Sequence, residues 1–388
     1  MKPFAKARQS IRMNGIREIM NYAEGLSDVI SLQIGEPSAA TPLHIQEAAV
    51  RAMSEGYTHY TANAGLPSLR EAISRRMRRD YRLDIPINRI VVTAGAVSAL
   101  HLSLLALVEA GEEVLIPNPV YPNYEALVRM QGAVPVYYST KEENGYLPVI
   151  EEIESLITPL TKAVIVNSPN NPTGTVYPKE VWEQLLSLAR TYDLYILSDE
   201  IYDGLVFEGE HICPLALDPQ LHDRVISIFG FSKVYAMTGW RLAYAIVPES
   251  LFPLICKLQE PVTTCASSIS QKAGEAALDG PQDFVDEMRE LYRRKRDLSC
   301  RLLKETNIPF TVPKGTFYIP INVQASGMTA QEFAVELLKS NRVMVAPCGS
   351  FGPGGEYLVR VCFAGDEKQL QEGLVRLGEF YASKTVHV

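Results

Sequence analysis

The sequence contains no run of apolar residues long enough to cross a lipid bilayer, although 47% of its 388 residues are hydrophobic. A membrane-spanning helix needs about 20 such residues. Long basic runs are also absent, and 45 acidic residues outnumber 37 basic ones, for a net charge of −8. The basic N-terminal residues from Lys2 to Arg12 are not followed by the apolar stretch of a secretory signal. We therefore expect a cytoplasmic protein with neither a membrane nor a nucleic-acid partner.

Patterns typical of metal sites and disulfide frameworks are missing as well. The six cysteines form no CxxC pair and have no spacing typical of a zinc site or a secreted disulfide scaffold. The six histidines show no ligand spacing either. We expect reduced, mostly buried cysteines and no metal.

Short runs rich in Val, Ile and Leu alternate with segments of helical periodicity. Between two of these runs, Pro178 begins a segment that places Val181, Leu185 and Leu188 on one face, as an amphipathic helix does. Such alternation is typical of a mostly parallel sheet wrapped by helices. We therefore predict an α/β fold with strands at Ile90–Val92, Val114–Ile116, Val134–Tyr138, Ala163–Val166, Leu194–Leu197, Val225–Phe229 and Leu242–Val247.

The character of the chain changes at about Pro281. A charged helical stretch to Arg296 precedes short strand-like segments at 317–323 and 357–363. The first 45 residues show sheet-type alternation only at Val29–Ile34, and we expect them to pack with the C-terminal unit. The predicted organisation is an N-terminal segment at 1–45, which forms part of the small domain, a large cofactor-binding domain at 46–280 and a small α+β domain at 281–388.

Polar or small residues follow four of the predicted strands. They are Thr93–Ala96, Asn171–Gly174, Asp199 and Lys233. Ligands of open parallel sheets bind beyond the carboxyl ends of the strands. We therefore expect these four positions to meet in one site.

The two basic residues of FSKVYAMTGWR, Lys233 and Arg241, suit a cofactor that carries an aldehyde and a phosphate. An amine can form an imine with the aldehyde. A guanidinium can grip the phosphate through two parallel hydrogen bonds. A lone lysine is more commonly a solvated surface charge, so it is the neighbouring groups that favour the catalytic interpretation.

Asp199, Tyr202 and Asn171 each have a role if the cofactor is a pyridine aldehyde phosphate. A buried carboxylate at Asp199 would keep the pyridine nitrogen protonated, so that the ring accepts electrons from a substrate carbanion. Tyr202 and Asn171 would donate to the phenolic oxygen of the ring. Taken one at a time, the three residues also fit a helix N-cap, a core tyrosine and a turn asparagine.

Three further groups can hold the phosphate, the ring and a substrate. The turn Gly95-Ala96-Val97 can present backbone N–H groups at a helix N-terminus, where phosphate binds. Tyr121 can stack on the pyridine, or it can be a half-buried loop tyrosine. Arg360 interrupts an apolar strand, and its guanidinium needs either a substrate carboxylate or a structural ion pair.

Seven segments stand in order along almost the whole chain: SLQIGEP (31–37), HYTANAGLPSLREAI (59–73), NSPNNPTG (167–174), SDEIYDGL (198–205), FSKVYAMTGWRLAY (231–244), PKGTFYI (313–319) and YLVRVCFA (357–364). With them the sequence resembles the class I/II aminotransferases, which are pyridoxal-phosphate enzymes of fold type I. The resemblance implies a large, mostly parallel seven-stranded α/β/α domain and a smaller α+β domain built from both chain ends. It also implies pyridoxal 5′-phosphate as the cofactor.

The resemblance assigns roles to the residues discussed above. It implies that Lys233 carries the cofactor as an imine and moves a proton between the substrate Cα and the cofactor C4′. Asp199 would face the pyridine nitrogen and Tyr121 the ring. Asn171 and Tyr202 would meet the phenolic oxygen.

The remaining roles concern the phosphate and the substrate. By resemblance, Arg241 and the Gly95 turn hold the phosphate. Arg360 would bind the α-carboxylate with help from that asparagine and from the backbone at Gly35. Tyr60 resembles the family tyrosine that reaches the phosphate of the neighbouring subunit, which implies a homodimer with shared active sites.

The chain departs from the family pattern in two places. Many relatives have a serine where this chain has Gly230, which leaves Ser232 as the nearest hydroxyl for the phosphate. Ala243 replaces a frequent glycine, and we have no functional explanation for it.

Substrate specificity is indicated by the side-chain pocket that the resemblance implies. It places Ile16, Tyr60, Val97 and a partner-subunit segment at 262–268 around the substrate side chain. Ile16 and Val97 are apolar, and no obvious arginine is available for a second carboxylate. We expect amino acids with aromatic or other neutral side chains, and 2-oxoglutarate as a second substrate, while broad specificity that includes dicarboxylates stays open.

Ping-pong transamination between an L-amino acid and a 2-oxo acid is the reaction that we expect. The same fold also supports C–S β-elimination, cyclopropane formation and decarboxylation. A regulator that only senses pyridoxal phosphate is a different class of function. Against it, the chain has no helix-turn-helix extension and keeps the residues that the chemistry needs.

Overall fold

The computed structural model describes residue 11, residues 15–218 and residues 222–385. Its centre is a seven-stranded sheet with the strand order β2-β8-β7-β6-β5-β3-β4. All neighbouring strands are parallel except for β8, which is antiparallel to both β7 and β2. The predicted α/β sheet is confirmed, and each strand overlaps a predicted run: β2 (Ile90–Thr93), β3 (Glu113–Asn118), β4 (Val134–Ser139), β5 (Thr161–Asn167), β6 (Tyr195–Asp199), β7 (Val225–Gly230) and β8 (Ala243–Ile246).

Helices cover both faces of this sheet, which explains why its strands are mostly apolar. Every residue of β2, β7 and β8 is buried, as expected when no face meets water. One face packs against α5 (Ala96–Leu107), α6 (Pro122–Met130) and α10 (Phe252–Thr263). The other packs against α3 (Leu43–Ser54), α4 (Pro67–Tyr81), α7 (Ile150–Ser155), α8 (Lys179–Thr191), α9 (Pro214–Leu217) and α11 (Ser268–Asp279).

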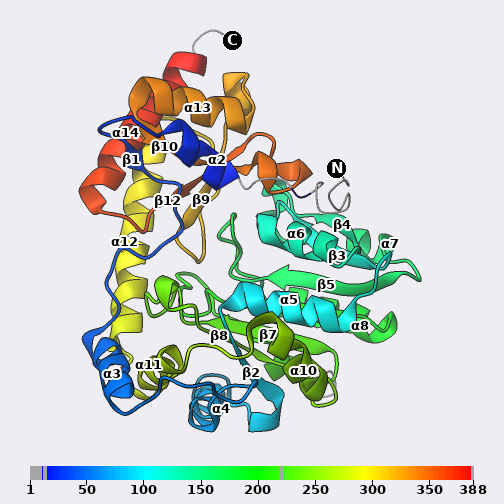
Figure 1. Cartoon of the computed structure of the whole chain (residues 1–388). Coiled ribbons are helices and arrows are strands. Elements are labelled where there is room, and N and C mark those ends of the chain that lie inside the picture. The colour runs from blue at the N-terminus through cyan, green and yellow to red at the C-terminus, as the bar shows by residue number, and fades with distance from the viewer. Residues whose placement is uncertain (1–10, 12–14, 219–221, 386–388) are drawn as a thin grey trace, which may run out of the picture.

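A second apolar core joins the two ends of the chain. Ile19, Ile30 and Leu32 pack with residues of the C-terminal region in one cluster, and Figure 1 shows α2 beside α13 and α14. A three-stranded antiparallel sheet, β11-β12-β9, lies here, and β1 pairs with β10 in parallel. The elements are α2 (Gly15–Tyr22), β1 (Ile30–Ser31), α12 (Asp283–Glu305), β9 (Tyr318–Asn322), α13 (Ala330–Asn341), β10 (Val343–Met344), β11 (Ala346–Pro347), β12 (Leu358–Cys362) and α14 (Glu367–Thr385). The domain boundaries at residues 45 and 280 stay a prediction.

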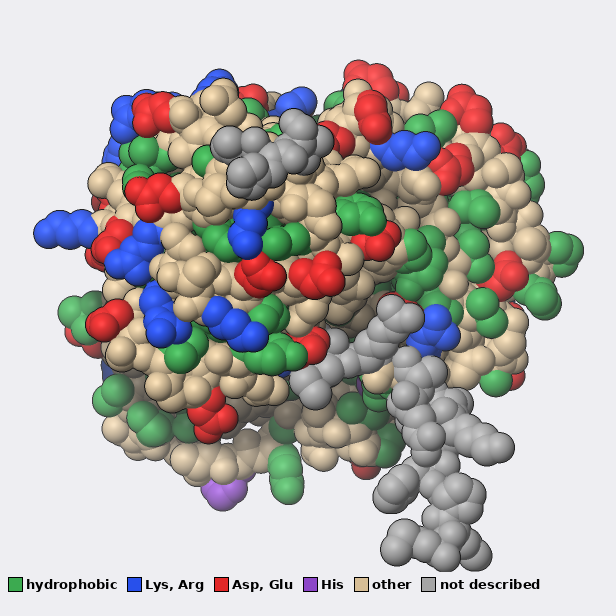
Figure 2. Space-filling model, turned by 90° about the horizontal axis from the view of Figure 1, so that it is seen from above, with side chains coloured by type: hydrophobic (Ala, Val, Ile, Leu, Met, Phe, Trp, Pro, Cys, Tyr) green, Lys and Arg blue, Asp and Glu red, His purple; other side chains and the backbone are tan. Residues whose placement is uncertain are grey.

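One face of the molecule carries side chains of mixed charge (Figure 2). On the face shown in Figure 2, Lys and Arg side chains are interspersed with Asp and Glu, and hydrophobic side chains lie scattered among them. Within the described residues, no helix combines the length and the apolar character that a bilayer crossing requires.

The carboxyl ends of the central strands face the C-terminal unit. β5 ends at Asn167, β6 ends at Asp199, and β7 ends shortly before Lys233. Because parallel strands bring these ends to the same edge of the sheet, segments far apart in sequence meet there.

Candidate active site

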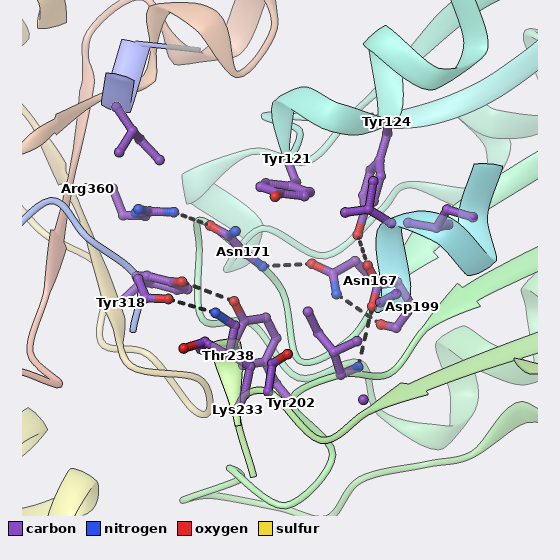
Figure 3. A pocket seen from close by; sticks show the side chains of 18 of the residues that line it. Tyr121, Tyr124, Asn167, Asn171, Asp199, Tyr202, Lys233, Thr238, Tyr318 and Arg360 are labelled. Carbon is purple, nitrogen blue, oxygen red and sulfur yellow. Dashed lines mark hydrogen bonds between the residues drawn. The ribbon is translucent and has the colours of Figure 1, made fainter. Parts of the chain in front are cut away.

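A cavity of about 250 Å³ opens at this edge of the sheet. Figure 3 shows side chains that converge on it from the sheet, from the loops after the strands and from β12. Of the residues predicted from sequence, Gly95 and Tyr60 lie outside its lining. The predicted residues that line it are Ile16, Gly35, Ala96, Val97, Tyr121, Asn171, Asp199, Tyr202, Ser232, Lys233, Arg241 and Arg360.

Lys233 brings an amine into the cavity from the loop after β7. Its Nζ donates a hydrogen bond to the carbonyl oxygen of Gly35 at 2.7 Å and lies 5.8 Å from the centre of the Phe317 ring. Burial lowers the pKa of Lys233 to about 8, and the positive charge of Arg360 acts in the same direction. The cavity therefore makes the neutral, nucleophilic amine accessible near physiological pH.

Asp199 is a buried carboxylate at the end of β6, with 2% of its surface exposed. Its Oδ2 accepts a hydrogen bond from the hydroxyl of Tyr124 at 2.5 Å. Burial raises the pKa of Asp199 to about 6, and the hydrogen bonds from Tyr124 and from the N–H of Ile201 act against this rise. The next α-helix, α9, begins only at Pro214, so Asp199 is not a helix N-cap.

Asn167, which the sequence analysis did not single out, joins two of the predicted residues. Its side-chain Nδ2 donates to the backbone oxygen of Asp199 at 2.9 Å, and its Oδ1 accepts from the N–H of Asn171 at 2.8 Å. Both contacts are drawn in Figure 3. The residue begins the NSPNNPTG segment, and its place at the end of β5 was the signal that could have identified it.

Arg360 is a fully buried cation on β12, with 1% of its surface exposed. Its Nη1 donates to Oδ1 of Asn171 at 2.8 Å, and its Nη2 donates to the backbone oxygen of Gln33 at 2.8 Å. Its Nε has no hydrogen-bond partner, and no described carboxylate forms an ion pair with it. The alternative of a structural ion pair is therefore wrong within the described part of the chain, and the guanidinium can bind an anionic ligand.

Tyr202 meets a second tyrosine that the sequence analysis did not identify as a site residue. The hydroxyls of Tyr202 and Tyr318 are 3.0 Å apart in the cavity wall. Burial raises the pKa of Tyr202 well above its ordinary value. Gly35 lies against Tyr318, since a Cβ at this glycine would be 1.9 Å from the Tyr318 hydroxyl oxygen.

Arg241 and the start of α5 form a compact positive cradle. Gly95 precedes α5 with a φ of +90°, and a Cβ at this position would lie 2.5 Å from Nη2 of Arg241. Nη1 of Arg241 donates to the backbone oxygen of Thr238 at 3.0 Å. Helix N-terminal N–H groups and a guanidinium on the same side of a cavity are a common phosphate site.

Tyr121 and Ile16 lie in the cavity wall, whereas Tyr60 does not. The Tyr121 ring packs edge-on against Tyr124, with centroids 5.6 Å apart. Ile16 packs against a small apolar cluster around Phe351. Tyr60 is 86% exposed, so within one chain it makes no contribution to the cavity.

Comparison with known proteins gives a consistent result. The family model for class I and II aminotransferases matches residues 27–377. The chain belongs to this family. It is 36% identical to aromatic-amino-acid aminotransferase 2 of Thermococcus litoralis, over 97% of each chain, and 38% identical to an aspartate aminotransferase of Pyrococcus abyssi, over 95% of this chain and 96% of the relative. The solved structure of Thermus thermophilus aspartate aminotransferase with maleate superposes with a TM-score of 0.93 at 35% identity, over 98% of this chain and 100% of that one.

The protein is accordingly a pyridoxal-phosphate-dependent aminotransferase of fold type I. The residues in the cavity fit this cofactor. Gly95 has no side chain, which lets the Arg241 guanidinium lie directly against the start of α5, and the buried carboxylate of Asp199 and the amine of Lys233 line the same cavity. The guanidinium fits the phosphate of the cofactor, the carboxylate fits its pyridine nitrogen, and the amine fits its aldehyde.

Proposed function

We propose that Lys233 attaches the cofactor through its aldehyde and then serves as the base of the transamination. When bound, the cofactor acts as an electron sink for the bond electrons of the substrate α-carbon. The lowered pKa of Lys233, about 8, supports this role because proton transfer is most effective near the operating pH. Once freed, Nζ would take the proton from Cα of the amino acid and return it at C4′ of the cofactor.

Asp199 is proposed to hold the proton on the pyridine nitrogen. Its carboxylate is buried, and its one side-chain donor is the hydroxyl of Tyr124. A positively charged N–H placed against it would lower the pKa of Asp199 from about 6 and keep the carboxylate ionised. Two hydrogen-bonded partners on opposite sides of one carboxylate would then fix its orientation.

The phosphate is proposed to bind between Arg241 and the N-terminus of α5. Ala96 supplies an N–H group there, and Ser232 supplies a hydroxyl from the loop of the catalytic lysine. Tyr121 is proposed to lie on the face of the pyridine ring. At Gly230 a Cβ would meet only Ile201, at 3.3 Å, so the serine of many relatives is sterically possible here and Ser232 is the substitute.

The α-carboxylate of the substrate is proposed to bind Arg360. Nε of this buried guanidinium has no partner among the described residues, and each Nη donates one hydrogen bond and has a second N–H, so the group can form the two parallel hydrogen bonds that a carboxylate accepts. Asn171 already contacts Arg360 and would also reach the phenolic oxygen of the cofactor together with Tyr202. Lys233 would no longer donate to the backbone oxygen of Gly35 once its Nζ is bound to the cofactor.

We propose that the preferred amino acids have aromatic or other neutral side chains, and that 2-oxoglutarate is a second substrate. Ile16 and Val97, which we expect near the substrate side chain, are apolar residues of the cavity lining. The only arginines in the described lining are Arg241 and Arg360, and both already have a proposed ligand. The names of the relatives include both aromatic and aspartate aminotransferases, so acidic substrates are the outcome that would correct this proposal.

A homodimer with shared active sites is also proposed. Tyr60 is 86% exposed, and the exposed apolar residues Leu43, Val50 and Met53 lie on nearby α3 at 68%, 58% and 49%. A partner subunit would bury them and bring Tyr60 to the phosphate of the other site. Mixing Lys233→Ala protomers with Tyr60→Ala protomers should then restore activity, because each mixed dimer contains one intact site. Failure of the mixture to exceed its components would contradict the shared site.

The observation that carries the proposed roles is the amine of Lys233, which lines the same cavity as the buried carboxylate of Asp199. Borohydride reduction of the holoenzyme should link the cofactor to Lys233, and peptide mapping identifies the site. Lys233→Ala should lose both the absorption of the imine between this lysine and the cofactor and turnover. Lys295→Ala is the matched control, because Lys295 is a buried lysine that lies outside the cavity and donates to the backbone oxygen of Gly365. Turnover by Lys233→Ala near the wild-type rate would refute the assignment.

The substrate proposal needs a separate experiment. The purified enzyme is mixed with each amino acid in turn, with and without 2-oxoglutarate, and the change in cofactor absorption is recorded. Release of pyruvate and ammonia without an oxo acid would instead indicate C–S β-elimination on the same fold.

A further inference from the structure

The hydroxyl of Tyr318 lies within hydrogen-bond distance of that of Tyr202. The two oxygens are 3.0 Å apart, the rings meet edge to face with centroids 5.9 Å apart, and both residues are 2% exposed. In Figure 3 both side chains lie beside Lys233 in the same part of the site. No other hydroxyl pair among the described residues lining the cavity is joined in this way.

A tyrosine hydroxyl has one proton to donate and lone pairs that accept. In the proposed function Tyr202 donates its proton to the phenolic oxygen of the cofactor, so its own oxygen is left as an acceptor. Tyr318 is the donor within reach. We propose that Tyr318 is a positioning residue whose hydroxyl donates to Tyr202 and thereby strengthens the hydrogen bond from Tyr202 to the cofactor, an inference that rests on the proposed role of Tyr202.

The fold holds the Tyr318 hydroxyl in this position from several sides. The guanidinium of Arg360 lies 4.1 Å from the centre of the Tyr318 ring. On another side, Gly35 leaves no space, since even a Cβ would lie 1.9 Å from the hydroxyl oxygen. Thr316, just before Tyr318, has a φ of +65°, which is rare for a β-branched residue, and its Oγ1 accepts from the N–H of Tyr318 at 3.3 Å. These contacts leave the hydroxyl little freedom to turn away from Tyr202.

Both hydroxyls keep their protons at neutral pH. Burial raises the pKa of Tyr202 and that of Tyr318 above the ordinary tyrosine value. Two protonated hydroxyls that end on an anionic oxygen form a one-way chain, and hydrogen bonds in such chains strengthen one another. Tyr318 would therefore withdraw negative charge from the phenolic oxygen through Tyr202, without touching the cofactor.

The consequence is measurable in the proton affinity of the cofactor-lysine linkage. Less charge on the phenolic oxygen means a weaker hold on the proton of the neighbouring nitrogen. The other titratable or charged groups around the two hydroxyls are Arg360 and Cys362 on β12, Tyr121 before α6, Lys233 after β7 and Tyr292 on α12. All of them are retained when the Tyr318 hydroxyl alone is deleted.

The experiment is a pH titration of the cofactor absorption in four holoenzymes: wild type, Tyr318→Phe, Tyr202→Phe and the double variant. Phenylalanine keeps the ring against Arg360 and removes only the hydroxyl. Tyr318→Phe should raise the titration midpoint by about 0.2–0.5 pH units, since the lost cooperative contribution is roughly 10–30% of one charged hydrogen bond. Tyr202→Phe should raise it further, and the double variant should match Tyr202→Phe alone.

Tyr292→Phe is the matched control. Tyr292 is a fully buried tyrosine whose ring packs 5.5 Å from Phe317, the neighbour of Tyr318, and its hydroxyl has no hydrogen-bond partner among the described residues. Its loss should leave the midpoint unchanged. An unchanged midpoint in Tyr318→Phe, or shifts that add in the double variant, would overturn the proposal. A wild-type holoenzyme in which borohydride does not fix the cofactor on Lys233 would instead refute the proposed function itself.

Discussion

Replacing Asp199 by Asn should stabilise the apoprotein while it abolishes catalysis. In the apoprotein the Asp199 carboxylate is buried, none of the described residues forms an ion pair with it, and it lacks the pyridine nitrogen that we propose for it. The same burial that raises the pKa of Asp199 to about 6 makes its ionised form costly. An asparagine has nearly the same shape, carries no charge and can still accept the hydrogen bond from Tyr124.

The magnitude follows from proton linkage. Unfolding returns the pKa of Asp199 from about 6 to its ordinary value of 3.8, and each pKa unit corresponds to about 1.36 kcal/mol. Because the folded-state pKa is the higher one, the wild-type side chain is at its most stabilising below pH 4 and loses that stability as the pH rises through 6. At pH 8 the apo form of Asp199→Asn should therefore be more stable than wild type by about 3 kcal/mol, and at pH 3.5 the two should be nearly equal.

Urea unfolding of the two apoproteins at one fixed protein concentration measures this difference at both pH values. Asp203→Asn is the contrasting control, because Asp203 is equally buried but forms an ion pair with Arg76 and accepts a hydrogen bond from Tyr81. That variant removes one of the two carboxylates that pair with the buried Arg76 and leaves Asp80 as the other, so it should be destabilised by about 1–3 kcal/mol. A destabilised Asp199→Asn apoprotein at pH 8, or a difference that does not depend on pH, would refute the reasoning.

Three further predictions follow from the same contacts. The rate at which the apoprotein takes up pyridoxal phosphate should rise about tenfold per pH unit below pH 8 and level off above it, because the pKa of Lys233 is about 8 instead of 10.5. Stopped-flow absorbance measures this rate, and a rate that continues to rise up to pH 10 would contradict the prediction. Arg360→Lys keeps the charge but loses the two parallel hydrogen bonds, so KM for amino acids should increase about 10- to 100-fold, and steady-state kinetics that show an unchanged KM would place the carboxylate elsewhere. Gly35→Ala places a Cβ against the Tyr318 hydroxyl, so thermal unfolding should show that the free energy of unfolding falls by about 1–3 kcal/mol. Gly56→Ala should lower the free energy of unfolding less, despite the φ of +85° at this glycine, because nothing lies within 4 Å of the added Cβ.

Much of the fold could be predicted from local sequence pattern. The runs at 163–166 and 225–229 are apolar without alternation because their strands are covered on both faces, and they became β5 and β7. The amphipathic helix α8 could also be predicted from its pattern, and the three residues expected on its apolar face, Val181, Leu185 and Leu188, are all buried. The antiparallel direction of β8 had no local signal, because direction depends on which strands it lies between.

The candidate site shows the same division. Lys233, Asp199 and Arg360 stand in segments whose order along the chain is characteristic of the family, so residue type and position were enough to name them. Tyr124 and Tyr318 could not be named in this way, because each acts through one hydroxyl placed by packing against a residue 75 or 116 positions away in sequence. From residue type alone, these two tyrosines could be predicted only as ordinary core residues.

The sequence by itself determined which segments are buried strands and helices and which reactive side chains follow the strands, because periodicity and strand ends are local properties. Only the tertiary structure decided which of those side chains form hydrogen bonds with one another, line the same cavity or are buried together. The shifts in the pKa values of Lys233 and Asp199 depend on that shared burial, and burial is a property of how distant segments pack together.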